Sequence, residues 1–387
     1  MAAEFCNIHN HSQYSLLDGK SKIPDMVSRA KELGQTSLGL CDHGSQFGTI
    51  EFYKECRKQG VKPVLGNEFY LVESHETKTE DGKREREYSH LTVVATNNDG
   101  WRTLNKLTAR SAKNFFYKPR ISIDDLKEFN EGLIVTSGCM ASLVSQSILD
   151  GDLVRAEKLL KQFKDIFGDR FYIEVQDGGV PGQKMLTEKL REFSKKLSIP
   201  RMVSNDSHYV RKEDAFAHSV MLAINTCTKM SDKPTYEGGK RFALSTEEYY
   251  MKGDQDMLSN GWEKEELFGT REIADRCNVE IKPSMRLPKY PKLPPGISSI
   301  NYLKELCRQG WDRKRIGWRT DYDYNARIVK EFEDIEKTGI ADYFLIVSDY
   351  CRWARAQGFG VGDGRGSAAG SLVSYLTDIT TIDPLKY

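Results

Sequence analysis

Short apolar runs alternate with amphipathic segments from the start of the chain to about residue 282, and this alternation limits the possible folds. The segment 152–168 shows the second part of the pattern, because its apolar residues recur at the three- and four-residue spacing of one helix face. Repeated strand–helix alternation predicts an α/β fold with a mostly parallel sheet, open or closed. The apolar runs are 36–40, 63–65, 91–95, 132–136, 171–175 and 200–203.

Length and charge narrow the class of protein. A chain of 387 residues is expected to form two domains. Its formal charge of +1 gives no overall basic signature, so any contact with nucleic acid must be local. We expect no signal peptide and no membrane span, since no apolar run is long enough. The eight cysteines are scattered without a C-x-x-C pair, which indicates a reducing compartment and predicts a cytoplasmic protein.

A proline-rich stretch marks the expected domain boundary. Residues 283–296 contain five prolines, a density that supports neither a helix nor a central strand. We therefore predict one domain over 1–282, a linker over 283–296, and a largely helical segment over 297–387 with its best helices at 326–337 and 342–357. The charged, aperiodic stretch 73–89 is expected to be a solvated loop.

Metal-ligating residue types recur at the ends of the apolar runs. The lead-in 4–8 reads as a short strand, so His9 and His11 would present two imidazoles to one point. Strand ends gather at one face of a parallel α/β fold, which would bring the other candidates to the same place. His75 and His218 are interpreted as structural. The candidate ligands are His9, His11, Asp18, His43, Glu68, His90, Cys139, Asp206 and His208.

This donor set predicts a shared divalent metal centre. Imidazole and carboxylate ligands together suit zinc, manganese or iron better than calcium. Nine candidates are too many for one ion, so two or three ions are expected, an arrangement that suits phosphate-ester hydrolysis. Asp18 and Asp206 could bridge ions or orient a histidine.

The motifs around these ligands resemble a known family. The stretch H-N-H-S-Q-Y-S-L-L-D-G, followed by C-D-H-G, G-N-E-F-Y, S-H-L, S-G-C-M and N-D-S-H-Y, is similar to the PHP domain that opens bacterial C-family DNA polymerases, the DNA polymerase III alpha family. The resemblance implies a distorted (β/α)7 barrel with a trinuclear site on the same nine residues, catalytic roles for Asp18, His43 and Asp206, and a metal-dependent 3′–5′ exonuclease. The alternatives are a phosphoesterase for small esters and a non-catalytic, metal-stabilised scaffold.

A glycine-rich stretch near the end of the chain is a second candidate site. Alternate residues from 358 to 366 are glycines and a helical pattern begins at Ser367, which is typical of a phosphate-binding turn, with a tight structural turn as the alternative. The string V-G-D-G-R-G-S resembles the palm of C-family polymerases, with Asp363 at the usual proline. The resemblance implies that Gly364, Arg365, Gly366 and Ser367 hold the triphosphate of a dNTP.

The palm-like segment is expected to be incomplete and mainly helical. The family's catalytic aspartates find no match in the chain, and Asp378 and Asp383 belong to the preceding connection. We therefore expect that the chain does not polymerise DNA alone. A complete enzyme, using magnesium, would need a second chain carrying the rest of the polymerase, beside DNA and other replisome subunits.

Aromatic and basic residues interleave over 113–120. Such a stretch can stack bases and follow phosphates, although packing of the aromatic side chains on the barrel is an equal alternative. A similar stretch in the family favours DNA at the barrel mouth. The candidate DNA-binding residues are Lys113, Phe115, Tyr117, Lys118 and Arg120.

Overall fold

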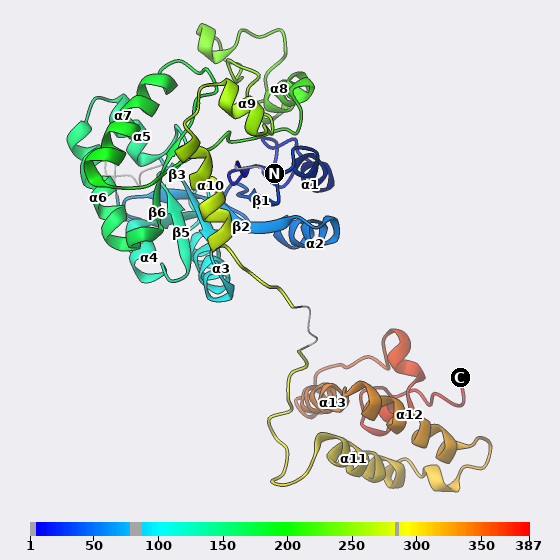
Figure 1. Ribbon diagram of the computed structural model, residues 1–387. Helices are drawn as coiled ribbons and strands as arrows, with labels where there is room; N and C mark the ends of the chain where they lie inside the picture. Colours follow the sequence, from blue (N-terminus) through cyan, green and yellow to red (C-terminus); the bar gives the residue numbers. More distant parts are fainter. Residues whose placement is uncertain (1–4, 78–86, 283–285) are drawn as a thin grey trace. The chain divides into compact units, whose positions relative to one another are not determined.

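The computed structural model describes residues 5–77, 87–282 and 286–387 (Figure 1). The chain divides into two compact units, Met1–Ile281 and Lys282–Tyr387. Part of the loop predicted over 73–89, the first residue of the lead-in 4–8, and the start of the proline-rich stretch lie outside the described residues. In the described part of the chain, no helix is long and apolar enough to cross a membrane.

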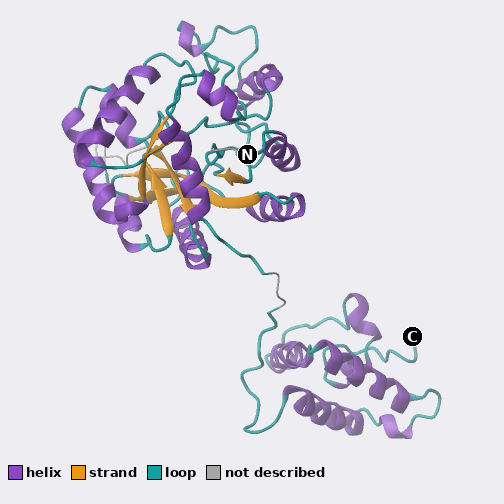
Figure 2. Ribbon diagram, viewed as in Figure 1, coloured by secondary structure: helices purple, strands orange, loops and turns teal. Residues whose placement is uncertain are grey.

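The first unit is built on a curled sheet surrounded by helices (Figure 2). The strands pair in the order β1-β2-β3-β5-β6-β7, and β4 pairs with β2 off this path. Four of the six pairings are parallel, and β3 is antiparallel to both of its neighbours. All six predicted apolar runs overlap strands, so the predicted α/β fold is confirmed. The strands are β1 Ser37–Leu40, β2 Lys62–Val72, β3 Ser89–Ala95, β4 Arg120–Ser122, β5 Leu133–Thr136, β6 Phe171–Val175 and β7 Arg201–Val203.

The helices of the first unit form an outer layer around the sheet (Figure 1). The helix predicted over 152–168 is α6, which ends at Gly168, a residue with a φ of 60° that glycine adopts easily. The helices are α1 Ile23–Glu32, α2 Thr49–Gln59, α3 Asn98–Lys113, α4 Ile123–Glu128, α5 Leu143–Leu149, α6 Leu153–Phe167, α7 Gln183–Leu197, α8 Ala215–Asn225, α9 Asp254–Ser259 and α10 Lys264–Arg276.

Residues 7–11 bridge the gap between the first and last strands of the sheet. Asn7 O accepts a hydrogen bond from Gly39 N at 2.7 Å, and His11 N donates to Ser207 O at 2.9 Å. Residues 5–8 have no regular secondary structure, so the strand predicted over 4–8 is not formed there. They meet β1 through a close backbone contact rather than a ladder of hydrogen bonds, since a Cβ on Gly39 would lie 2.0 Å from Ile8 O. This segment completes the distorted barrel.

The barrel interior and its outer shell are separate hydrophobic clusters, because successive side chains of a strand point to opposite faces. Val64, Ile134 and Tyr172 belong to the inner cluster, which residues of α10 close from one end. The neighbouring strand residues, such as Leu65 and Ile173, pack outward against the helices. The interior is therefore apolar at one end and available for polar groups at the other.

The second unit is helical around its own small core, as predicted for 297–387. The predicted helices at 326–337 and 342–357 are confirmed as α12 and α13. Leu303, Leu345 and Leu376 are fully buried in the core. The helices are α11 Ser299–Arg313, α12 Tyr324–Thr338, α13 Ala341–Ala356 and the short α14 Leu372–Leu376.

Candidate metal centre

The candidate ligands extend the interior face of the barrel strands. On β2, Val64 and Glu68 both point inward, and only Glu68 lies at the polar end. His90 lies at the start of β3 rather than at its end. Because β3 runs antiparallel to β2 and β5, its first residues lie at the same edge as the ends of the parallel strands. The topology thus explains why the ligand lies at the start of its strand in this one case.

Glu68 lies at the centre of the cluster. Its Oε1 lies 3.3 Å from His9 Nε2 and 3.2 Å from His90 Nδ1, and Cys139 Sγ lies 3.4 Å away. Its Oε2 lies 2.5 Å from His43 Nδ1. Glu68 is 1% exposed. One buried carboxylate therefore contacts ligands from four separate segments of the chain.

Asp206 and Asp18 extend the cluster on its other side. Asp206 Oδ1 lies 3.1 Å from His11 Nε2 and 3.7 Å from His208 Nδ1. Asp18 Oδ2 lies 2.9 Å from His43 Nε2. Together with the contacts of Glu68, these distances bring all nine predicted ligands into one group.

The electrostatics of the group favour anionic carboxylates among tightly packed imidazoles. Burial alone would raise the pKa of Glu68, but His90, His43 and His9 hold it well below its ordinary value. Burial lowers the pKa of His11 to about 3, aided by His43 and His208. Burial would also lower the pKa of His43, but Glu68 and Asp18 raise it to about 10. The raised pKa of His43 therefore favours a positive charge beside the carboxylates of Glu68 and Asp18.

The donor set fits divalent metal ions. His43 Nδ1 and Glu68 Oε2 are buried and lie 2.5 Å apart, so two potential ligand atoms from different segments already face each other. Three sets of potential ligand atoms lie within 4.8 Å of one another, which is the spacing that shared coordination requires. These sets are His11, His43 and His208; His9, His11 and Asp206; and His43, Glu68 and His90.

A second layer of side chains orients the ligands, and its main member was missed from the sequence. Glu174 lies in β6, is 1% exposed, and accepts a hydrogen bond from His9 Nδ1 at 2.7 Å. Thr136 and Ser204 donate to the same carboxylate, both at 2.5 Å. With Nδ1 engaged, His9 turns Nε2 toward the cluster. The sequence feature that could have indicated this role is that Glu174 is the single acidic residue inside the apolar run 171–175.

Asp42 supports the opposite side of the cluster. Its carboxylate accepts hydrogen bonds from Ser12 N and from Ser15 Oγ, both at 2.7 Å. Ser15 Oγ in turn lies 3.1 Å from His11 Nδ1 and accepts a hydrogen bond from His43 N. The turn after His11 is thereby fixed against the turn that carries His43.

The two remaining histidines are placed outside the ligand set. His75 Nε2 lies 2.7 Å from Asp125 Oδ2, away from the cluster. His218 is buried, and its Nε2 lies 2.7 Å from the backbone oxygen of Asp18. Their interpretation as structural residues agrees with these contacts.

Comparison with known proteins places both units in one family. A family model described as the PHP domain matches residues 7–178, and one described as the bacterial DNA polymerase III alpha NTPase domain matches residues 301–387. Proteins named DNA polymerase III subunit alpha align with nearly the whole chain: 36% identity for Thermus aquaticus (99% of this chain, 36% of the relative) and 38% for Borreliella burgdorferi (100% and 33%). The chain belongs to the DNA polymerase III alpha family.

This chain spans about a third of the length of these DNA polymerase III alpha relatives. Among solved structures, an amidohydrolase from Chromobacterium violaceum overlays on 53% of this chain and 87% of its own, with a TM-score of 0.36 and 12% identity.

The glycine-rich loop of the DNA polymerase III alpha NTPase segment differs from its predicted form. Residues 366–370 form a 3-10 turn, and the helix begins at Leu372 rather than at Ser367. Glu331 accepts hydrogen bonds from Leu372 N at 2.8 Å and Val373 N at 3.0 Å. The helix predicted to begin at Ser367 therefore starts at Leu372, where a carboxylate already holds its first amides, and the phosphate-binding role of the loop stays a prediction.

The predicted triphosphate residues themselves lie on the surface. Gly364, Arg365, Gly366 and Ser367 are all exposed. Asp363, at the family's usual proline, binds Thr381 through both its backbone oxygen, at 2.9 Å, and its carboxylate. This pair ties the loop to the end of the described chain.

The aromatic and basic stretch 113–120 is divided between surface and interior. Phe115 and Tyr117 are 61% and 57% exposed, and Lys118 Nζ lies 5.1 Å from the centre of the Tyr70 ring. The Tyr70 ring lies 5.5 Å from that of His90, so the stretch borders the metal centre. Arg120 is 1% exposed with its guanidinium over the Phe116 ring. Its prediction as a DNA contact is wrong, since β4 directs it inward.

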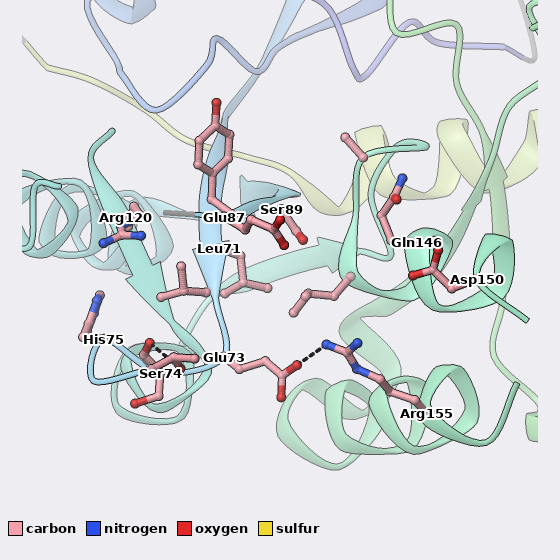
Figure 3. Close-up of a pocket in the computed structure, with 15 residues that line it drawn as sticks. Leu71, Glu73, Ser74, His75, Glu87, Ser89, Arg120, Gln146, Asp150 and Arg155 are labelled. Carbon is pink, nitrogen blue, oxygen red and sulfur yellow. Dashed lines mark hydrogen bonds and ion pairs between the residues drawn. The ribbon is translucent and has the colours of Figure 1, made fainter. Parts of the chain in front are cut away.

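A cavity of about 880 Å³ lies apart from the metal centre (Figure 3). His75, Arg120 and Gln146 line it, and Glu73 forms an ion pair with Arg155 across its edge. None of the nine candidate ligands is among its described lining residues.

Proposed function

We propose that the first unit is a metal-dependent phosphodiesterase that removes nucleotides from the 3′ end of DNA, within the N-terminal portion of a DNA polymerase III alpha subunit. The convergence of nine ligand side chains on Glu68 and Asp206 carries this proposal. All nine ligand positions of the PHP pattern hold a ligand-competent residue, as an active centre requires.

The side chains would have different roles in such a centre. Divalent ions, two or three of zinc, manganese or iron, would supply an acidified water and neutralise phosphate charge. Glu68 and Asp206 would hold neighbouring ions together, and Glu174 would keep His9 in its ligating orientation. Asp18 and His43, which contact each other, lie where they could exchange a proton with bound water.

DNA would approach along the exposed part of 113–120. Phe115 and Tyr117 offer aromatic faces and Lys113 and Lys118 offer charge beside the Tyr70–His90 edge of the centre. Arg120 has no part in this surface because it is buried.

The test is metal analysis joined to a single-stranded DNA degradation assay on the full chain. Wild type should contain bound metal and shorten DNA from its 3′ end with added manganese, and His9→Ala should contain less metal and lose the DNA degradation. The matched control is His75→Ala, which lies outside the cluster and should retain both. Turnover of small phosphate esters alone would favour a stand-alone phosphoesterase, and bound metal without any turnover would favour a scaffold.

The second unit is proposed to serve a complete polymerase. Gly364, Arg365, Gly366 and Ser367 would contact the triphosphate of a dNTP through exposed backbone amides and the Arg365 guanidinium. Nucleotidyl transfer would further require magnesium and the family's catalytic aspartates, supplied by another segment or chain. DNA and replisome subunits are the proposed partners, and the proposed location is the cytoplasm.

A further inference from the structure

Tyr249 lies beside the metal centre, in a segment for which the sequence predicted no function. Its backbone oxygen accepts hydrogen bonds from His208 N at 2.9 Å and Tyr209 N at 3.4 Å. Tyr250 O accepts from Asn205 Nδ2 at 2.6 Å. Residues 249–250 are therefore fixed to the same turn that supplies Asp206 and His208.

The ring of Tyr249 faces the cluster. Its centre lies 6.0 Å from that of His208, nearly edge-on at 84°. Burial raises the pKa of the Tyr249 phenol, and the nearby charge of Asp206 raises it further.

The turn after β6 lies beside the hydroxyl end of this ring. A Cβ built on Gly178 would lie 3.6 Å from Tyr249 Cε2 and 3.7 Å from Cζ, which is ordinary van der Waals contact. Among the described residues, no hydrogen bond joins the Tyr249 hydroxyl to another group, although the side chain is only half-buried. The phenol is therefore a hydrogen-bond donor beside the centre with no protein partner among the described residues.

We propose that the Tyr249 hydroxyl donates a hydrogen bond to a phosphoryl oxygen of the phosphodiester bound at the metal centre. This inference rests on the proposed function and adds a substrate contact that comes from the segment 249–250. The charge on that oxygen increases during hydrolysis, so a neutral donor fixed beside it would stabilise the transition state more than the ground state.

The test compares Tyr249→Phe with the control Tyr250→Phe in the full chain loaded with manganese. Three quantities are measured: metal content, binding of inorganic phosphate by calorimetry, and hydrolysis of bis(p-nitrophenyl) phosphate and single-stranded DNA. Tyr249→Phe should weaken phosphate binding about fivefold and lower kcat about 10- to 100-fold, with little change in KM. Metal content and Tm should match wild type, since the hydroxyl has no partner to lose in the part of the chain that the structure describes. Tyr250→Phe should resemble wild type throughout.

Unchanged phosphate binding and kcat in Tyr249→Phe would overturn the proposal. Loss of metal together with activity would also overturn it, because the residue would then support the ligands rather than contact substrate. If wild type hydrolyses no phosphodiester, the proposed function fails, and the phosphate titration still decides the role of Tyr249.

Discussion

Glu174 shows that one residue behind a metal centre can matter as much as a ligand. Its carboxylate is fully buried and accepts four hydrogen bonds, from His9, Thr136, Ser204 and Gln176. His9 and His11 were predicted as ligands from their spacing, whereas Glu174 was missed and Arg120 was assigned to the surface. Residue type reveals what a side chain can do, but its direction depends on strand register, which the sequence alone left open.

Glu174→Gln should lower the metal affinity of the first unit about 10- to 100-fold. The amide keeps the shape of the side chain but presents an NH2 group that competes with the His9 N–H, so the imidazole loses its fixed orientation. Competition with a fluorescent zinc chelator measures the change. Glu272→Gln is the matched control, because that carboxylate binds Tyr172 Oη outside the cluster; equal affinities of Glu174→Gln and wild type would contradict the assigned role.

At the scale of elements, two features differ from the prediction by apolar periodicity: the lead-in 5–8 and the start of the last helix. Helix capping and close backbone contact explain them. The main strands and the helices α6, α12 and α13 follow their apolar patterns. The lead-in 5–8 is irregular because it lies against Gly39 while bridging two edges of the barrel. The last helix starts at Leu372, since Ser371 caps it and Glu331 binds its first amides. Both outcomes depend on partners distant in sequence.

Glu331→Ala should expose the amides of Leu372 and Val373 and destabilise α14. Loss of a charge-assisted cap costs about 1–2 kcal/mol, which corresponds to roughly a 5- to 30-fold rise in local amide exchange. Hydrogen exchange followed by mass spectrometry measures this exchange rate over residues 371–376. Glu333→Ala on the same helix, at an exposed position, should leave that exchange unchanged.

The capping box at the start of α4 predicts a pH-dependent contribution to stability. Asp125 Oδ2 accepts from Ser122 N at 2.8 Å and lies 2.7 Å from His75 Nε2. Burial would raise the pKa of Asp125, but the Ser122 and His75 contacts hold it below its ordinary value. The contribution is therefore complete above the unfolded pKa of about 3.9 and is lost as pH falls through the lower folded value.

Asp125→Asn should accordingly lower the Tm at pH 7 by the equivalent of about 1–2 kcal/mol. The difference between wild type and Asp125→Asn should shrink as pH falls below about 4. Thermal melts across this pH range measure it, and a difference that stays constant or grows on acidification would contradict the assigned role.

At the scale of the whole molecule, two independent cores imply two separable responses to metal removal. The first unit gathers several buried carboxylates in one place, and the second has its own core and none of the nine ligands. Chelation should lower the free energy of unfolding of the first unit by about 2.7 kcal/mol for each site that held an ion at 100 times its Kd, and its Tm should fall accordingly. The Tm of the second unit should not change. Calorimetry before and after chelation measures the unfolding transitions of both units.

Anomalous X-ray diffraction from crystals grown with manganese tests the central claim most directly. We expect two or three anomalous peaks among the nine ligands, each within coordination distance of Glu68, Asp206 or Asp18, and loss of at least one peak in His9→Ala. Protein at neutral pH with saturating manganese and no peak between these side chains would contradict the account.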